Sequence, residues 1–235
     1  MSSGLYETPK IRVVGDRGLL AEYGDKIDPV VNKKVISIAI GLEHDAPTGM
    51  IEIIPSYRSL LIVYDPSVTT SSVLQESLSS LEKRLQEIEI PPSQTVEIPV
   101  CYGGEFGPDI QFVAESNNLT VDAVIRLHSE PEYHIFMIGF SPGFPYLGVL
   151  PKELHTPRKK TPRTQVLAGS VGIANEQTGI YPVTSPGGWQ LIGLTPLKLF
   201  NPERSNPFLY KVGDRIKFKP ISPEEYRRLA EKGIK

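Results

Sequence analysis

The stretch I-F-M-I-G-F-S-P-G-F-P-Y-L-G, residues 135–148, joins a short apolar run to a loop of glycine, proline and aromatic residues. Similar short apolar runs, punctuated by glycine and proline, recur from Tyr133 to the end of the chain. They occupy residues 135–140, 165–168, 171–174, 189–194 and 216–218. Short strands separated by turn residues are typical of a β-barrel or a sandwich with long loops. The second part of the chain is therefore predicted to be mainly β.

The N-terminal part of the chain has a different pattern, in which strand pairs are followed by helices. Residues 11–14 and 19–22 predict one hairpin, and residues 50–54 and 60–64 predict two more strands.

Two amphipathic helices accompany these strands. Asp28 and Pro29 form a helix start, and the apolar residues after them recur at helical spacing: Val31, Val35, Ile38 and Leu42. A second helix is predicted from about Ser72, which is spaced to form a capping box with Gln75. Its apolar stripe consists of Leu74, Leu78, Leu81, Leu85 and Ile88. Paired strands with two helices on one face predict a small α+β domain of ferredoxin-like type.

The segment Pro91-Pro92-Ser93 ends this pattern. We therefore expect a ferredoxin-like α+β domain at residues 1–92 and a mainly β domain at residues 93–235. Near the C-terminus, Ser222 and Pro223 form a well-defined helix start.

Two short helices are predicted after the boundary, one from residues 107–109 and one from Thr120. A helix-turn-helix motif is one interpretation of this pair. The second segment, however, carries only Arg126 and His128 as candidate DNA contacts, so a packing role is favoured. His128 is in line with Val121 and Ile125 on the apolar face, which predicts a buried, hydrogen-bonded histidine rather than a general base.

Composition and charge exclude several functional classes. A net charge of −2 and a pI of about 6.1 provide no chain-wide field to attract nucleic acid or an anionic membrane. The single cysteine, Cys101, excludes an internal disulfide and a C-x-x-C metal or redox site. The sequence begins without a basic and then apolar leader, and it lacks an apolar run of membrane-spanning length. We therefore expect a cytoplasmic protein that binds neither nucleic acid nor membranes.

Residues 139–143, G-F-S-P-G, match the G-x-S-x-G pattern of a hydrolase nucleophile elbow. In that elbow, the backbone N–H after the serine helps to form the oxyanion hole. Here that residue is Pro142, which has no N–H. Of the four histidines only His155 follows Ser141, and no acid-rich strand end comes after it to orient it. We therefore expect that Ser141 is not a nucleophile.

The same loop presents aromatic rings on a backbone stiffened by proline. Such a loop suits the wall of a ligand pocket or a partner surface. A tight barrel connection whose rings cap the core is the alternative interpretation. The loop residues that could take either role are Phe140, Ser141, Pro142, Gly143, Phe144 and Tyr146.

Arg158 and Arg163 end two Thr-Pro-Arg segments, where proline can orient a guanidinium toward a carboxylate or phosphate. A solvated basic face, with Lys159 and Lys160 beside them, is the alternative.

The segment Gly169-Ser170-Val171-Gly172 could direct backbone N–H groups at an anion. A bulged strand is the commoner structure for such a sequence. Residues 177–179 and 185–190 predict turns that carry amide side chains and Trp189. The sequence contains no Walker A, H-E-x-x-H or dinucleotide motif, so no metal site is expected.

An ordered series of motifs is far more specific than any of these signals alone. The series is G-F-S-P-G-F-P-Y-L-G (139–148), T-P-R (156–158), T-P-R (161–163), A-G-S-V-G-I-A (168–174), Q-T-G-I-Y-P (177–182) and S-P-G-G-W-Q-L-I-G (185–193). Together with P-S-Y-R-S-L-L-I-V-Y-D at residues 55–65, it resembles the allophanate hydrolase subunit 1 family over nearly the whole chain. That family includes the B subunit of 5-oxoprolinase and the sporulation-kinase inhibitor of spore-forming bacteria.

The resemblance implies a small α+β domain followed by a cyclophilin-like β-barrel. It also implies an ATP-dependent 5-oxoprolinase in which this chain, inactive alone, acts with two partners: a homologous C subunit, and an A subunit. The complex would convert 5-oxoproline to L-glutamate, with ATP as the cofactor.

This chemistry requires groups that neutralise the substrate carboxylate and the transferred phosphate, which are arginines and oriented amides. The candidate substrate- or phosphate-binding residues are His128, Arg158, Arg163, Gly169, Ser170, Gln177, Thr178, Trp189 and Gln190.

Two other functions remain open from the sequence. Kinase-inhibiting members of the family would use the same fold as a binding module without turnover. Carboxyl transfer, as in the related region of urea carboxylase, would require biotin on a partner.

Overall fold

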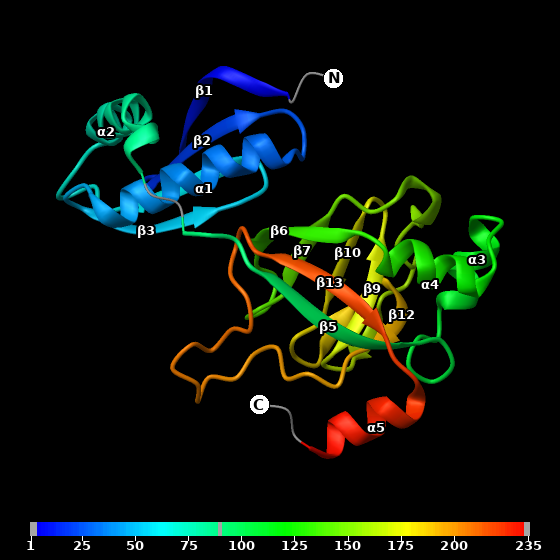
Figure 1. Cartoon of the computed structure of the whole chain (residues 1–235). Coiled ribbons are helices and arrows are strands. Elements are labelled where there is room, and N and C mark those ends of the chain that lie inside the picture. The colour runs from blue at the N-terminus through cyan, green and yellow to red at the C-terminus, as the bar shows by residue number, and fades with distance from the viewer. Residues whose placement is uncertain (1–3, 89–90, 233–235) are drawn as a thin grey trace. The chain divides into compact units, whose positions relative to one another are not determined.

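The computed structural model describes residues 4–88 and 91–232. The chain forms two compact units, Met1–Pro92 and Ser93–Lys235, and each has its own hydrophobic core. Figure 1 shows the sheet and helices of the first unit and the barrel of the second.

The first unit is an antiparallel sheet packed against two helices. Its described elements are β1 (Leu5–Val14), β2 (Gly18–Gly24), α1 (Pro29–His44), β3 (Met50–Pro55), β4 (Ser59–Tyr64), α2 (Ser71–Lys83) and a 3-10 turn at Leu85–Glu87. The strand order is β1-β2-β4-β3. Alternate residues of the two central strands are buried against the helices, as the period of two in a strand requires. They are Leu19, Ala21, Tyr23, Leu60, Ile62 and Tyr64.

The start of α1 was predicted correctly, whereas the predicted cap of α2 was wrong. Asp28 caps α1 by accepting a hydrogen bond from the Val30 N–H at 2.8 Å, and Pro29 occupies the first turn. The cap of α2 is Thr70, whose hydroxyl accepts from the Val73 N–H, and not Ser72. Ser72 lies inside α2 because the helix begins at Ser71.

The α+β content of this unit is confirmed, but the ferredoxin-like type is not. The ferredoxin-like order is β-α-β-β-α-β, while the order here is β-β-α-β-β-α. The physical reason is that β1 and β2 pair directly across a short turn, so no helix crosses between them.

Seven strands from the described part of the second unit close into a barrel, in the order β10-β7-β6-β13-β5-β12-β9. This architecture fits the expected cyclophilin-like barrel. The strands are β5 (Thr95–Tyr102), β6 (Glu132–Ile138), β7 (Pro145–Gly148), β9 (Ser170–Ala174), β10 (Gln177–Ile180), β12 (Gln190–Leu194) and β13 (Arg215–Pro220). Outside the barrel, β8 (Arg163–Val166) pairs with β11 (Ser185–Gly187).

Three helices and a 3-10 turn at Lys152–Leu154 complete the described second unit. The helices are α3 (Ile110–Ser116), α4 (Val121–Ser129) and α5 (Pro223–Glu231). The hydroxyls of Thr120 and Ser222 cap α4 and α5, as predicted. Helices α3 and α4 bury Val113 and Val124 in the barrel core, so the predicted packing role is confirmed.

Two segments predicted as turns are strands. Residues 177–179 lie in β10, and residues 185–187 form β11. The turn before β10 is made by Asn175 and Glu176, since Ala174 pairs with Gln177 and Asn175 has a φ of 52°.

Candidate functional site

The candidate residues divide between the barrel interior and its surface. His128, Ser170, Thr178 and Gln190 are buried, whereas Arg158 is exposed. None of the helices in residues 4–88 and 91–232 is both long and apolar enough to cross a bilayer.

His128 is fully buried and forms a chain of hydrogen bonds across the barrel core. The Thr178 hydroxyl donates to the Gly172 carbonyl at 3.1 Å and lies 2.8 Å from His128 Nε2. Nε2 must therefore carry the proton, and Nδ1 accepts from the Tyr102 hydroxyl at 2.8 Å. Burial lowers the pKa of His128 to about 3, so its ring is neutral at physiological pH.

The prediction of a buried, hydrogen-bonded His128 is thus confirmed. Thr178 is also fully buried, and its hydroxyl is used by this chain of hydrogen bonds. Neither side chain contacts solvent, so both support the barrel from inside.

The segment around Gly169 forms internal backbone hydrogen bonds. The Gly169 N–H donates to the Tyr181 carbonyl at 2.6 Å, and the Ser170 N–H donates to the Leu167 carbonyl at 3.1 Å. These two N–H groups are therefore not free to bind an anion. Gly169 has a φ of +87°, and a Cβ there would lie 2.4 Å from the Thr195 carbonyl oxygen, which explains the glycine.

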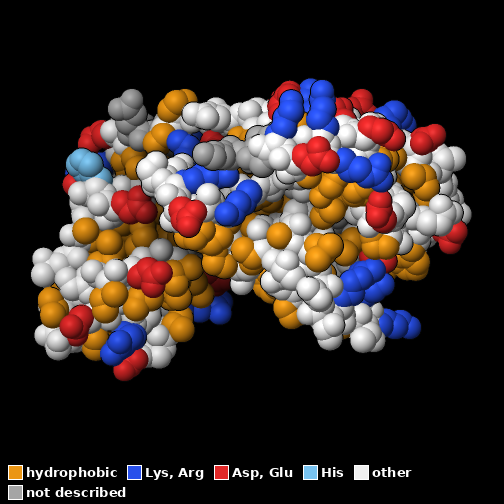
Figure 2. All heavy atoms as spheres, turned by 90° about the horizontal axis from the view of Figure 1, so that it is seen from below, with side chains coloured by type: hydrophobic (Ala, Val, Ile, Leu, Met, Phe, Trp, Pro, Cys, Tyr) orange, Lys and Arg blue, Asp and Glu red, His pale blue; other side chains and the backbone are white. Residues whose placement is uncertain are grey.

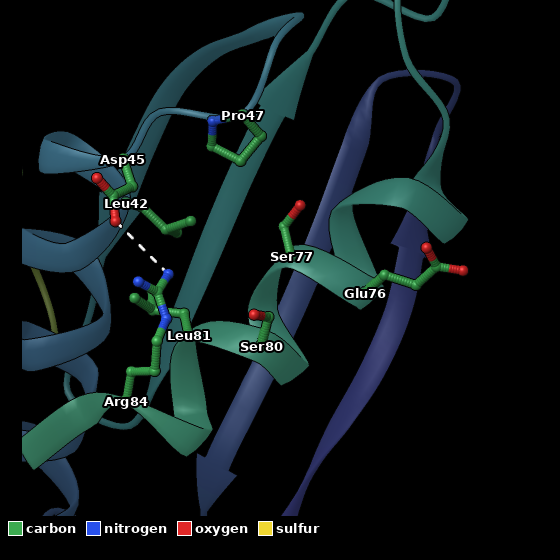
Figure 3. Close-up of a pocket in the computed structure, with 8 residues that line it drawn as sticks. All are labelled: Leu42, Asp45, Pro47, Glu76, Ser77, Ser80, Leu81 and Arg84. Atoms are coloured by element: carbon green, nitrogen blue, oxygen red, sulfur yellow. Dashed lines mark ion pairs between the residues drawn. The ribbon is translucent and has the colours of Figure 1, made fainter.

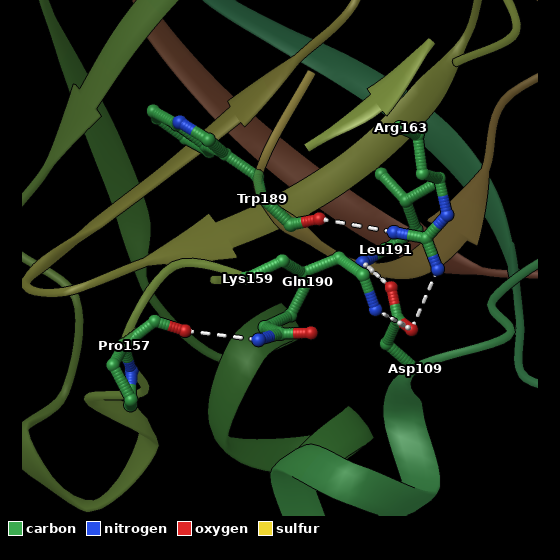
Figure 4. Close-up of polar contacts among 7 residues, drawn as sticks. All are labelled: Asp109, Pro157, Lys159, Arg163, Trp189, Gln190 and Leu191. Atoms are coloured by element: carbon green, nitrogen blue, oxygen red, sulfur yellow. Dashed lines mark hydrogen bonds and ion pairs between the residues drawn. The ribbon is translucent and has the colours of Figure 1, made fainter. Parts of the chain in front are cut away.

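A charged cluster joins the start of α3 to β8 and β12 (Figure 4). One oxygen of Asp109 accepts from Arg163 Nη2 at 2.7 Å and lies 3.4 Å from Lys159 Nζ. The other oxygen accepts from the Leu191 N–H at 2.7 Å. Arg163 also donates to the Trp189 carbonyl at 3.5 Å. Arg163 is therefore neither a solvated side chain nor an open anion clamp, because its guanidinium is paired within the chain.

The carboxylate of Asp109 is held ionised by these surroundings. Burial acts to raise its pKa, but the hydrogen bonds from Arg163 and the Leu191 N–H outweigh burial, together with the positive charges of Arg163 and Lys159. The pKa of Asp109 consequently lies below its usual value. The side chain is only 9% exposed, whereas that of Lys159 is 31% exposed. Two cations for one carboxylate leave the cluster with a net positive charge, which favours an anionic ligand.

Gln190 and Trp189 link this cluster to the segment that carries Arg158. Gln190 Nε2 donates to the Pro157 carbonyl at 2.9 Å and so fixes the segment that carries Arg158. The Trp189 indole points away from Asp109 (Figure 4). The Arg158 guanidinium lies over that indole, 5.9 Å from the ring centre, in a cation–π contact.

The aromatic rings of the loop at residues 139–148 pack beside Trp189. Phe144 contacts Trp189 and Tyr181 edge to face, with ring centres 5.4 and 5.2 Å apart. The ring centres of Tyr146 and Phe144 lie 4.9 Å apart. Phe144, Tyr181 and Trp189 are buried in a small core of their own, while Phe140 remains 64% exposed. Phe144 therefore caps a core, as the alternative interpretation of the loop expects, whereas Phe140 faces solvent.

Ser141 lacks the surroundings of a nucleophile. Its hydroxyl oxygen is buried and has no hydrogen-bond partner among the described residues. The loop leads from β6 to another strand, β7, rather than to the helix that a nucleophile elbow requires.

Gln177 begins β10 and is half-buried. It lies opposite Ala174 of the neighbouring strand, so the structure places it in the barrel wall rather than in a turn.

A surface recess of about 360 Å³ lies in the first unit (Figure 3). Arg84 and Asp45 form an ion pair at 3.5 Å on its wall, and both side chains are about half exposed. The recess is lined by Leu42, Asp45, Pro47, Glu76, Ser77, Ser80, Leu81 and Arg84. None of these is a residue for which the sequence predicts a site.

The face of the molecule drawn in Figure 2 carries mixed charge. Figure 2 shows basic and acidic side chains interspersed with hydrophobic ones over the face that it draws. Within the described ranges, no group of three or more His, Cys, Asp or Glu side chains is placed to hold a metal ion.

Comparison with known proteins places this chain in a family. Residues 9–210 match the family described as carboxyltransferase domain, subdomain C and D. The chain belongs to this family. It is 43% identical to the B subunit of 5-oxoprolinase from Bacillus subtilis over 94% of this chain and 97% of that protein. It is 40% identical to the protein of the same name from Escherichia coli O157:H7, over 88% of this chain and 94% of that one.

More distant relatives are longer than this chain. The crystal structure of the protein TTHA0988 superposes on this chain with a TM-score of 0.78 at 35% identity. The match covers 88% of this chain but only 40% of the TTHA0988 chain. Urea amidolyase of Lachancea kluyveri is 27% identical over 95% of this chain and 14% of that protein. The resemblance inferred from the sequence motifs is therefore confirmed.

Sequence reasoning missed Asp109 as a member of the site and treated it only as part of a helix start. Lys159 entered only in the alternative interpretation of a solvated basic face. No local signal marks the pairing, because Arg163 is 54 residues from Asp109 along the chain.

Proposed function

We propose that this chain is the B subunit of an ATP-dependent 5-oxoprolinase that acts with a C subunit, homologous to it, and with an A subunit. The observation that carries the proposal is its 43% identity to a protein named as the B subunit of 5-oxoprolinase, across nearly the full length of both chains. The use of ATP as co-substrate suits a complex in the cytoplasm.

The reaction explains why ATP is needed. A five-membered lactam resists hydrolysis, and transfer of the γ-phosphoryl group to its amide oxygen makes the ring carbon electrophilic. Water supplies the new carboxylate oxygen, the ring C–N bond breaks, and the nitrogen takes a proton. The products are L-glutamate, ADP and inorganic phosphate.

Within this chain, the charged cluster around Asp109, together with Arg158 over Trp189, suits the binding of anionic groups. Arg158 and Lys159 reach solvent, and Asp109 holds the guanidinium of Arg163 in one orientation. A substrate carboxylate or a phosphate next to this cluster would be attracted by its net positive charge. Gln190 supports the site by fixing the Pro157 carbonyl, one residue before Arg158.

Reconstitution tests the proposal. The purified chain and the C and A subunits are assayed alone and in every combination for release of glutamate and ADP from 5-oxoproline and ATP. Turnover is expected only when all three are present, because the bacterial relatives are named as one subunit of an enzyme. Full turnover by the chain alone would remove the need for partners, and no turnover by the complete set would overturn the assigned reaction.

Carboxyl transfer is the competing reaction, because the urea amidolyase relative shares this fold region. It is tested in the same preparations by adding carboxybiotin as the carboxyl donor and urea as the acceptor. Transfer of the carboxyl group from carboxybiotin to urea without glutamate formation would favour carboxyl transfer over ring opening.

A further inference from the structure

The loop between β6 and β7 holds Phe140 in an unusual backbone conformation. The Ser141 N–H donates to the Gly139 carbonyl at 2.7 Å, which closes a three-residue turn around Phe140. Phe140 has a φ of +62°, in the left-handed region. A γ-turn with positive φ is rare and strained, and a bulky aromatic residue is seldom found there. Strain of this kind persists where the surroundings enforce it, often at functional positions.

Several contacts enforce the conformation. The Phe144 N–H donates to the Ser141 carbonyl at 3.0 Å, which closes a second turn with Pro142 and Gly143 at its centre. Gly143 has a φ of +83°, as the third position of a type II turn requires. The Gly139 N–H donates to the Phe144 carbonyl at 3.1 Å and closes the loop at its base.

A buried tyrosine anchors the tip of the loop. The Tyr210 hydroxyl donates to the Gly143 carbonyl at 2.7 Å, and Tyr210 itself is only 4% exposed. The loop backbone is thus fixed at its base, centre and tip.

This rigid backbone places an aromatic ring in solvent. Phe140 is 64% exposed, and its ring contacts the buried rings of Phe144 and Tyr181 edge to face, with centres 5.5 and 6.4 Å away. An exposed ring on a fixed backbone loses little conformational freedom when another surface covers it. Rigid aromatic residues of this kind commonly dominate the energy of protein interfaces.

The comparisons indicate what covers this ring. The two bacterial relatives are named as one subunit of an enzyme. In TTHA0988, at 35% identity, the region that corresponds to this chain makes up only 40% of a single polypeptide. The rest of that polypeptide is tethered to this region, and we infer that a separate partner chain takes its place here.

We propose that Phe140 is the anchor residue by which this chain docks onto that second polypeptide, which is the C subunit in the function proposed above. The ring enters an apolar recess of the partner. Arg158, a candidate anion-binding residue, lies at the other end of the same ring cluster, over Trp189.

The test measures association of the purified chain with the C subunit in isothermal titration calorimetry. Phe140→Ala is expected to weaken binding by at least about tenfold, which is the loss expected of an interface anchor. Phe112→Ala is the matched control, because Phe112 is also an exposed phenylalanine of the second unit, 48% accessible on α3. The affinity of the Phe112→Ala variant for the C subunit is expected to stay within about twofold of wild type.

A second variant separates docking from misfolding. Phe140→Gly relaxes the positive φ, so it is expected to melt at or above the wild-type temperature while binding the partner as weakly as Phe140→Ala. Loss of association together with retained thermal stability supports the proposal.

Three outcomes would overturn the docking role. The first is wild-type affinity of Phe140→Ala for the partner. The second is unchanged association with a raised KM for 5-oxoproline or ATP in the complete complex, which would make Phe140 a ligand contact. The third is self-association of this chain that depends on Phe140, which would make a second copy the occupant. If the wild-type chain binds its partner but no glutamate forms in the complete complex, the reaction assignment fails while the docking result stands.

Discussion

Asp109→Asn is the most informative single change in the charged cluster. Asp109 accepts three contacts: Arg163 Nη2 at 2.7 Å, the Leu191 N–H at 2.7 Å and Lys159 Nζ at 3.4 Å. Asparagine has one acceptor oxygen, so it can serve either Arg163 or the Leu191 N–H. The amide group that replaces the second oxygen faces a donor, and the negative charge between two cations is lost.

The expected loss follows from these contacts. A hydrogen bond to a charged group contributes about 1.5–3 kcal/mol. Screening by solvent is limited here, because Asp109 and Arg163 are 9% and 25% exposed. We therefore expect Asp109→Asn to lower the free energy of unfolding of the second unit by about 2 kcal/mol.

Urea denaturation measures this quantity directly. Trp189 is the single tryptophan of the chain and lies in the second unit, so its fluorescence reports unfolding of that unit. Glu105→Gln is the matched control, because Glu105 pairs with Arg227 at 3.5 Å with both side chains exposed. Such exposed pairs contribute little, so no measurable change is expected. A loss below about 0.5 kcal/mol for Asp109→Asn would refute the reasoning. Arg163 would then not be held by Asp109 and would be available to an external ligand.

Three further predictions concern the barrel, the loop and the charged cluster. The pKa of His128 is lowered to about 3 in the fold, so the unfolded chain binds more protons, and stability should fall by up to about 1.4 kcal/mol per pH unit from pH 6.5 down to 3. His128→Gln should remove that contribution in urea titrations, and an unchanged slope would contradict the assigned burial. Ser141→Ala should retain more than about a tenth of the activity of the reconstituted complex, since Pro142 lacks an oxyanion donor; a fluorophosphonate adduct on Ser141 would contradict it. Arg163→Lys should lose nearly as much activity as Arg163→Ala, because lysine lacks the planar fork that contacts both Asp109 and the Trp189 carbonyl. Near-wild-type kinetics in both variants would remove Arg163 from the site.

The elements that sequence predicted well are those with a local signal. Asp28, Thr120 and Ser222 each act as the helix cap that their side chains predicted. Their preference depends on a hydrogen bond to a backbone N–H two or three residues away, which the sequence contains.

Strands of the barrel were harder to predict because their signal is not local. Residues 177–179 include threonine and glycine and resemble a turn, but β9 and β7 pair with them on both sides. The positive φ of Asn175 shows that the true turn lies just before this segment. Tertiary pairing overrides local preference in such short strands.

For the candidate site, too, the sequence predicted what its motifs record and missed what depends on tertiary contacts. The motif series correctly identified the family, and the loop at 139–148 and both Thr-Pro-Arg segments belong to the second unit. The role of Asp109 depends on distances between residues far apart in the chain, which no spacing in the sequence records. His128 and Thr178 were candidates for ligand binding, yet the fold uses them inside the barrel.

The parallel pairing of β5 with β13 determines when the barrel can close during synthesis on the ribosome. Gln94, at the start of the barrel, bonds through its N–H to the side chain of Asp214, 120 residues later. One edge of β5, the first strand of the barrel, can pair with β12, but its other edge must wait until β13 is synthesised. By then the first unit already has all its strands and helices. Until that moment both edges of the growing sheet are open, and open edges are where chains aggregate. A chain that ends before Arg215 lacks β13. We expect the first unit of such a chain to fold and its incomplete second unit to aggregate.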